Sequence, residues 1–170
     1  MARFAVIGLG RFGMTLARAL ASSGAEVIAI DTAREPVDEA RELVSLSLRL
    51  DSTDEKALAA HDVDKMDAVI VGIGESFESK ALTIATLKKM GAKRIICRAE
   101  SDLRARILSA IGADDVVYPE EESALRLAQK LMAPNIVDYV ELAEGHSVVQ
   151  FEAPRAFHGK QIIELDPVSY

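Results

Sequence analysis

The stretch F-A-V-I-G-L-G-R-F-G, residues 4–13, decides the fold of this chain. Its first four residues are apolar and predict a short buried strand, and residues 11–22 carry apolar side chains at helical spacing. Between the two segments lie Gly8, Gly10 and Gly13. A strand, a G-x-G-x-x-G turn and a helix in this order are typical of the first βα unit of a nucleotide-binding α/β fold.

Each part of this motif has a physical reason. Gly8 allows the tight turn, Gly10 leaves the backbone open to a phosphate, and Gly13 lets the helix pack closely on the sheet. The helix N-terminus offers free N–H groups and the positive end of its dipole to phosphates. Asp31 ends the next predicted strand. It can accept hydrogen bonds from ribose hydroxyls and would repel a 2′-phosphate.

The motif therefore predicts a ligand made of adenosine and phosphates, and it does not separate NAD from ADP or ATP. The alternative is that the glycines serve only the turn and that Asp31 only caps the following helix. Arg11, next to Phe12 in the same loop, is informative because a long cation here can reach terminal phosphates. Its alternative is a solvated arginine, which is poorly placed for the helix dipole.

Two further stretches are candidates for contact with the ligand. Asp51 follows the third predicted strand and is expected to accept a hydrogen bond from a base or ribose group. Ser52 and Glu55 have the spacing of a capping box, so this loop also has a purely structural interpretation. Gly74 ends the G-I-G stretch after the fourth strand, where small residues leave space for a ligand or simply make a turn.

Residues 1–118 alternate short apolar strands with helical patterns. Further strands are predicted at 27–30, 46–50, 68–71, 94–97 and 116–118, and helices at 34–43, 54–60, 77–90 and 102–111. Six strands separated by helices predict an α/β fold with a doubly wound, parallel, six-stranded, Rossmann-like sheet. Right-handed crossovers favour the strand order 3-2-1-4-5-6.

The remaining residues follow another pattern. A helix is predicted at 120–132, interrupted by Pro134, and a second apolar segment follows at 136–142. A strand is predicted at 147–151. We expect three parts in all: the core at 1–118, crossover and dimerisation helices at 119–143, and the start of an incomplete C-terminal lobe at 144–170.

Composition narrows the class of protein. The 170 residues are 49% apolar and carry a net charge of −7, which argues against a general nucleic-acid surface. A single cysteine excludes a disulfide framework and fits a reducing cytosol. The N-terminus has no signal pattern, and no apolar run is long enough to span a bilayer. We therefore expect a cytoplasmic protein that meets the membrane only through a partner.

Four stretches together resemble one family: residues 4–13, Asp31, D-S-T-D at 51–54, and I-G-A-D-D-V-V-Y-P-E at 111–120. They resemble the regulator-of-potassium-conductance (RCK) domain, also called the KTN or TrkA N-terminal domain. The likeness is strongest to cytosolic regulatory subunits of Ktr- and Trk-type potassium uptake systems. It implies homodimers in an octameric ring beneath a membrane-embedded potassium-translocating subunit. ATP/ADP exchange or NAD(H) binding would then change the shape of the ring.

The same resemblance implies roles for individual residues. Arg11 corresponds to a phosphate-contacting arginine, Asp31 to the ribose acid, and Arg98 to a basic position near the phosphates. Glu120 corresponds to an acid linked to a divalent cation, Mg²⁺ or Ca²⁺, in the ATP-bound dimer. From the residues alone, acids at 120–122 need only favour a helix N-terminus. The resemblance also implies a crossover helix that is hinged at Pro134-Asn135, with residues 136–142 as its second segment.

The main rival is a fragment of an NAD-dependent oxidoreductase. Such an enzyme needs a proton-handling group near the nicotinamide, and none of the three histidines ends a crevice-forming strand. Cys97 is expected in the core. Ser76, Ser79 and Lys80 open the fourth helix and can touch a ligand, but they form no triad. We therefore expect a switch without turnover. A third possibility is a bare dimerisation module with no nucleotide affinity.

Overall fold

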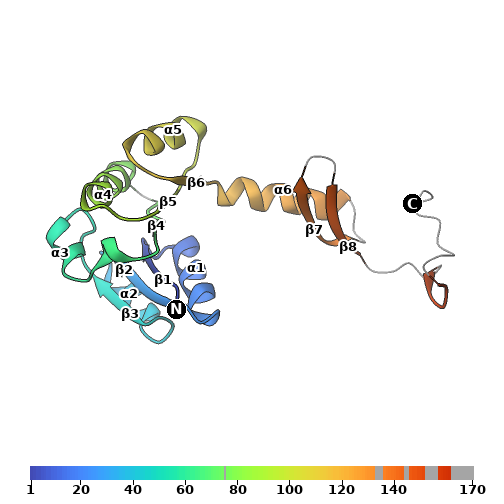
Figure 1. Cartoon of the computed structure of the whole chain (residues 1–170), viewed down its shortest axis with the longest axis horizontal. Helices are drawn as coiled ribbons and strands as arrows, with labels where there is room; N and C mark the ends of the chain where they lie inside the picture. The colour runs from blue at the N-terminus through green and yellow to red at the C-terminus, as the bar shows by residue number, and fades with distance from the viewer. Residues whose placement is uncertain (75, 133–135, 144–145, 152–156, 162–170) are drawn as a thin grey trace. The chain divides into compact units, whose positions relative to one another are not determined.

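The computed structural model describes residues 1–74, 76–132, 136–143, 146–151 and 157–161, and side chains only outside residues 133–156. The chain divides into two units, residues 1–120 and 121–170, and each is described by itself. The first unit is built on one parallel sheet (Figure 1). Its strands are β1 (Arg3–Ile7), β2 (Glu26–Asp31), β3 (Leu46–Arg49), β4 (Ala68–Val71), β5 (Ile95–Arg98) and β6 (Asp115–Val117).

The strand order is β3-β2-β1-β4-β5-β6, and every neighbouring pair is parallel, as the sequence predicted. The order reverses between β1 and β4, so the loops after these strands diverge and leave a crevice at the carboxyl edge. β3 is an edge strand, which agrees with its alternating polar pattern.

Helices cover both faces of this sheet (Figure 1). They are α1 (Arg11–Ser22), α2 (Arg34–Ala40), α3 (Glu55–Ala59), α4 (Phe77–Met90) and α5 (Asp102–Ile111), with a 3-10 helix at Val63–Lys65. Alternation along β1 sends Val6 to the cluster beneath α1 and α2, and Ala5 and Ile7 to the cluster beneath α3, α4 and α5. Each fully buried Ile or Leu contributes about 1.5–3 kcal/mol of transfer free energy, so both clusters hold the crevice in place.

Helix α2 is shorter than predicted. The pattern over 34–43 predicted a helix that the structure ends at Ala40. The N–H of Arg41 bonds the carbonyl of Asp38, three residues back, and the N–H groups of Leu43 and Val44 both turn to the carbonyl of Ala40. The last turn therefore tightens and stops, so α2 does not reach the predicted end.

The prediction of a second helical segment in the C-terminal part is wrong. Helix α6 (Pro119–Met132) matches the expected helix, but β7 (Ile136–Ala143) is a strand and not the second segment of a crossover helix. It pairs antiparallel with β8 (His146–Phe151), with Tyr139 opposite Val149. The run I-V-D-Y-V is rich in β-branched and aromatic residues, and the neighbouring strand overrides its apolar spacing. The expected hinge at Pro134-Asn135 lies outside the described residues.

Within the part of the chain that the structure describes, no helix combines the length and the apolar character needed to cross a membrane.

Candidate functional site

The glycine turn is built by close contacts that exclude side chains at two positions. Gly8 has φ of +90°, and a Cβ there would lie 2.7 Å from the backbone nitrogen of Ile73. A Cβ at Gly13 would collide with the carbonyl oxygen of Gly8. A Cβ at Gly10, in contrast, would meet nothing within 4 Å. Gly8 and Gly13 therefore serve the packing of β1, β4 and α1, whereas Gly10 faces open space.

This open space is at the N-terminus of α1. Gly10 is the N-cap residue of α1, and no side chain among the described residues caps the helix there. The first-turn N–H groups of α1 are therefore not satisfied by a capping side chain. Such a terminus attracts anions through its N–H groups and its dipole.

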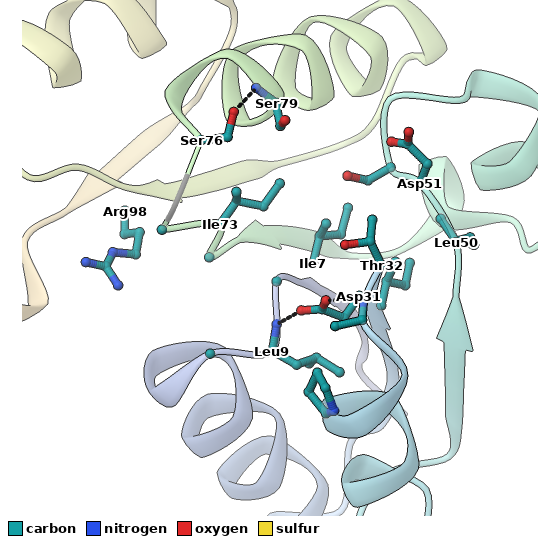
Figure 2. A pocket seen from close by; sticks show the side chains of 18 residues that line it. Ile7, Leu9, Asp31, Thr32, Leu50, Asp51, Ile73, Ser76, Ser79 and Arg98 are labelled. Carbon is teal, nitrogen blue, oxygen red and sulfur yellow. Dashed lines mark hydrogen bonds between the residues drawn. The ribbon is translucent and has the colours of Figure 1, made fainter.

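A cavity of about 470 Å³ lies at the carboxyl edge of the sheet, above this turn (Figure 2). Its lining comes from the glycine turn, the ends of β1, β2 and β5, the loops after β2, β3 and β4, and the starts of α2 and α4. Six predicted site residues line it: Gly8, Gly10, Asp31, Asp51, Gly74 and Arg98. In Figure 2, Arg98 lies on one side of the cavity and Asp51 on the other, with Asp31 between them.

Four predicted site residues do not line the cavity. Arg11 is exposed at the start of α1, and its side chain makes no hydrogen bond or ion pair within the described residues. Phe12 packs against the cluster beneath α1, so it is a core residue of the turn. Gly13 is buried in the turn, and Glu120 is exposed in the first turn of α6. The structure thus separates the glycine loop into a packing part and an open part.

Asp31 ties two loops together at the rim of the cavity. Its Oδ2 accepts a 2.7 Å hydrogen bond from the N–H of Leu9, and its Oδ1 accepts one of 2.8 Å from the N–H of Ala33. Asp31 therefore does more than bond the start of α2, because its other oxygen holds the glycine turn at Leu9. Each carboxylate oxygen keeps a second lone pair, which remains available to a hydroxyl donor.

The loop that begins at Asp51 forms hydrogen bonds that differ from the predicted capping box. The Oδ1 of Asp51 accepts hydrogen bonds from the N–H and the hydroxyl of Thr53, and these bonds lower the pKa of Asp51 below its ordinary value. The predicted capping box is not formed, because Asp54 caps α3 instead. Ser52 is buried, and its hydroxyl lies 2.8 Å from that of Thr83. An ionised Asp51 with its Oδ2 unused in the described residues therefore lines the cavity.

Arg98 belongs to a network of charges that the sequence did not reveal. Its Nη2 donates to Glu120 at 2.8 Å, while its Nε is buried, has no hydrogen-bond partner in the described residues and lies 3.9 Å from Glu100. Lys80 is 1% exposed, and its Nζ donates to the Arg98 carbonyl at 3.0 Å and to Glu100 at 2.8 Å. The second oxygen of Glu100 accepts a 3.1 Å bond from Arg104.

The network fixes the ionisation of Glu100. Burial raises the pKa of Glu100, but the hydrogen bonds from Lys80 and Arg104 outweigh burial and hold the pKa below its ordinary value. The signal in the sequence was Lys80, a lysine in the first turn of the amphipathic helix α4. The sequence analysis gave it only as a residue that can touch a ligand, and it lies beneath the cavity wall without lining the cavity.

The structure also gives the positions of the two serines at the start of α4 and of Cys97. Ser76 caps α4 by accepting the N–H of Ser79 at 3.1 Å, and both serines line the cavity (Figure 2). Cys97 is buried in β5, where burial raises the pKa of its thiol to about 11, so it is a core residue and a poor nucleophile. Among the described residues, no group of three His, Cys, Asp or Glu could hold a metal ion.

The sheet order, the glycine turn and the crevice define a domain of the Rossmann-like class. The family model that describes the TrkA-N domain matches residues 4–119. The chain therefore belongs to the TrkA-N domain family, which confirms the resemblance found in the sequence.

Relatives and solved structures agree with this assignment. Ktr system potassium uptake protein C of Bacillus subtilis is 40% identical over 163 residues, covering 96% of this chain and 74% of that protein. Ktr system potassium uptake protein A of the same organism is 32% identical, with the same shares. The crystal structure of the TrkA-N domain of inner membrane protein ybaL from Escherichia coli has a TM-score of 0.67 and 26% identity. It covers 76% of this chain and 96% of that chain.

A further structure holds a ligand. The crystal structure of GsuK bound to ADP has a TM-score of 0.63 and 25% identity. The match covers 76% of this chain and 34% of that chain.

Proposed function

We propose that this chain is a nucleotide-sensing regulatory subunit of a potassium uptake system. An adenine nucleotide binds in the cavity and changes the conformation of a homo-oligomer, which gates a membrane-embedded potassium-translocating partner from its cytoplasmic side. The observation that carries the proposal is the open N-terminus of α1 at Gly10, which lies in a cavity with Asp31 and Arg98. The Ktr relatives and the ADP-bound GsuK structure support the biological setting.

The chemistry of the lining suggests how the ligand lies. The ribose hydroxyls donate to Asp31, and the base extends toward Asp51 and the loop after β3. The phosphates lie over Gly10, where helix N–H groups and the dipole favour negative charge. Arg98 supplies a cation on the far side of the cavity, and exposed Arg11 is free to turn toward terminal phosphates. ATP, ADP and NAD(H) all share the part of the molecule that these groups recognise.

Arg98 offers a route from ligand to assembly, because the same side chain lines the cavity and holds Glu120 in the first turn of α6. A phosphate competes with Glu120 for the Arg98 guanidinium, since both are anionic acceptors. A nucleotide that binds better when this ion pair is broken shifts the population toward that state. In this proposal the γ-phosphate supplies the difference between ATP and ADP.

Two exposed apolar surfaces support a homo-oligomer. None of the side chains of α6, all of them described, is buried, and Leu131 and Met132 are 73% and 86% exposed. We propose that this surface makes the dimer. A second apolar surface, formed by Leu82 of α4 with Leu103 and Ile107 of α5, joins dimers into a ring, for which we propose eight subunits. Residues 119–143 then form the dimerisation region, with a strand in place of its second helix, and residues 144–170 begin a C-terminal lobe.

Among the residues that the structure describes, no group of three His, Cys, Asp or Glu side chains could hold a divalent cation. Glu120 offers a single carboxylate, and the Oε1 of this group accepts a hydrogen bond from Arg98. The switch proposed here works through Arg98 and needs no Mg²⁺ or Ca²⁺.

Calorimetric titration with ATP, ADP, NAD⁺ and NADH, with and without Mg²⁺, tests the proposal. We expect adenine nucleotides to compete for one site per chain and ATP to shift the oligomer in sedimentation experiments. Tighter binding of NADH than of ATP would instead indicate a redox sensor. The absence of binding by all four ligands would contradict the proposal and favour a bare dimerisation module. Substrate-dependent turnover of NADH would favour the oxidoreductase.

A further inference from the structure

A second cavity, of about 390 Å³, lies between α2 and the edge strand β3. It is separate from the candidate nucleotide cavity and has a different chemistry. Its lining residues, which we call the arginine groove, are Arg34, Val37, Asp38, Arg41, Ser47 and Arg49.

The local structure explains why these side chains meet. Positions 34, 37, 38 and 41 share one face of a helix, because residues three and four apart are neighbours on its surface. Ser47 and Arg49 are two apart on β3 and therefore point to the same face of the sheet. The groove forms where the helix face and the strand face meet.

The groove has a surplus of positive charge. Three guanidinium cations face a single carboxylate, which leaves 3 − 1 = +2 on its lining, in a chain whose net charge is −7. Asp38 accepts one bond on each oxygen, from Arg34 Nε at 3.1 Å and from Arg41 Nη2 at 3.0 Å. Arg49 Nε donates to the carbonyl of Thr32 at 2.9 Å. Each bond uses one donor of an arginine that has five, so most donors stay available.

Stability of the fold does not account for this arrangement. Arg34 and Arg41 are 81% and 67% exposed, and exposed ion pairs contribute about 0–1 kcal/mol. The bonds to Asp38 and to the Thr32 carbonyl do, however, hold the three guanidinium groups around one space. The Ser47 hydroxyl, which has no partner in the described part of the chain, adds a donor on the same face.

We propose that the arginine groove binds a dianionic phosphate group. Planar guanidinium groups bind phosphate oxygens in pairs, and a charge of −2 matches the surplus on the lining. Two sources share this chemistry. The phosphate is either a free phosphate compound, or it is carried on the ribose of a nucleotide in the neighbouring cavity. The second source rests on the proposed function.

Residues that line the two cavities are adjacent in the sequence. A phosphate on the ribose of a nucleotide in the first cavity is therefore a chemically reasonable ligand of the groove. Thr32 and Ala33 line the nucleotide cavity, and Arg34, the next residue, lines the groove. Arg49, which lines the groove, donates a hydrogen bond to the carbonyl of Thr32. The carboxylate of Asp31 lies nearby and keeps its charge while it accepts two backbone N–H bonds, so it repels a 2′-phosphate and opposes this second source, which is therefore tested separately.

A structural alternative makes a different prediction. Cations on an edge strand discourage pairing with other sheets, and Arg49 on β3 has this position. In that case the arginines need bind nothing, and their replacement changes aggregation but not affinity for phosphate.

The test for a free phosphate compound is calorimetric titration with pyrophosphate in a phosphate-free, low-salt buffer. It uses Gly10→Asp protein, in which a carboxylate blocks the N-terminus of α1, so a failure of the nucleotide site does not affect the result. We expect Arg41→Gln to weaken pyrophosphate binding about tenfold, as for the loss of one charge-assisted hydrogen bond. Arg18→Gln is the matched control, because Arg18 is an exposed arginine paired with Glu39 outside the groove.

The test for a ribose phosphate compares NADP⁺ with NAD⁺ on protein with an unaltered glycine turn. Tighter binding of NADP⁺, with the advantage lost in Arg41→Gln and kept in Arg18→Gln, identifies the ribose phosphate as the ligand. Arg49→Gln provides a second variant, and thermal melting checks that each protein is folded. The proposal is overturned if neither probe distinguishes Arg41→Gln from Arg18→Gln.

Discussion

The Arg98 guanidinium donates a 2.8 Å hydrogen bond to Glu120, and it does so from the wall of the candidate nucleotide cavity. One side chain thus joins the end of β5 to the first turn of α6. Its buried Nε has no hydrogen-bond partner in the described residues, which leaves Arg98 with an unmet donor inside the wall. In the proposed function a phosphate competes with Glu120 for this guanidinium, so Arg98 is suited to report whether an anion is present.

Glu120→Gln tests this competition directly. Removal of the carboxylate charge releases Arg98 toward the phosphates, so ATP affinity should rise by up to about fivefold, the scale of an exposed ion pair. Calorimetry measures the affinity, and Glu121→Gln is the matched control because Glu121 is the adjacent exposed acid. An unchanged or weaker affinity in Glu120→Gln would show that the ion pair does not oppose nucleotide binding.

Gly10→Asp separates folding from binding. Gly10 is an N-cap residue in an extended conformation with open space at its Cβ, so aspartate fits and caps α1 as well as glycine or better. Its charge repels phosphates, and we expect nucleotide affinity to fall about a hundredfold or more. Gly10→Asn is the control of equal size without charge. Equal affinities of the Asp and Asn variants would place the phosphates elsewhere.

The exposed side of α6 predicts an effect on assembly. Leu127 and Leu131 lie one turn apart on the helix and are 58% and 73% exposed. Because they are not buried in the chain, Leu127→Glu with Leu131→Glu should leave the thermal stability of residues 1–120 within about 0.5 kcal/mol. Analytical ultracentrifugation should show loss of the dimer, whereas Gln129→Glu retains it. A dimer that survives the double change would need another interface.

Lys80 should be essential to the stability of the cavity wall. Lys80→Met removes the buried partner of Glu100, which is partly exposed and keeps its bond from Arg104, so we expect a loss of about 1.5–3 kcal/mol, the scale of a hydrogen bond to a charged group. Urea unfolding measures the loss. Lys89→Met removes an exposed ion pair with Glu55 and should cost about 0–1 kcal/mol. Similar midpoints for the two variants would mean that Lys80 does not support the fold.

The pKa of Glu100 predicts a loss of stability in acid. Its pKa is lowered below the ordinary 4.5, so the unfolded chain binds more protons and stability falls as the pH drops below about 4.5 and through the lower folded value. At neutral pH the contribution is complete. Glu100→Gln should lose less stability than the unaltered protein as the pH falls from about 5 to about 3. Parallel losses in the two proteins would assign the effect to other acids.

The sequence predicted the sheet because its signals are local. Phe4–Ile7 and Ala68–Val71 are short apolar runs bounded by turn residues, and three glycines at one spacing admit few turn geometries. The strand order followed from handedness rules that act on any chain with this alternation. These features needed no knowledge of contacts between distant residues.

The candidate site was only partly predictable, since several of its features depend on distant contacts. Glu100 and Lys80 are 20 residues apart, and only the fold shows that they meet beneath Arg98. Ser52 had the spacing of a capping residue, but its hydroxyl turns to Thr83 on another helix. Residues 136–142 had apolar spacing that suits a short helix as well as a strand, and the partner strand decided the outcome.

Helix α6 contributes no buried side chain, and this has a consequence for the energetics of the whole subunit. A helix of fourteen residues is only marginally stable in water without a packing partner. If a second copy supplies that packing, the folded fraction of α6 follows mass action and rises with protein concentration. Far-ultraviolet circular dichroism would then show a loss of helical signal as the protein is diluted. The helix content of α6 would thus report the concentration of subunits.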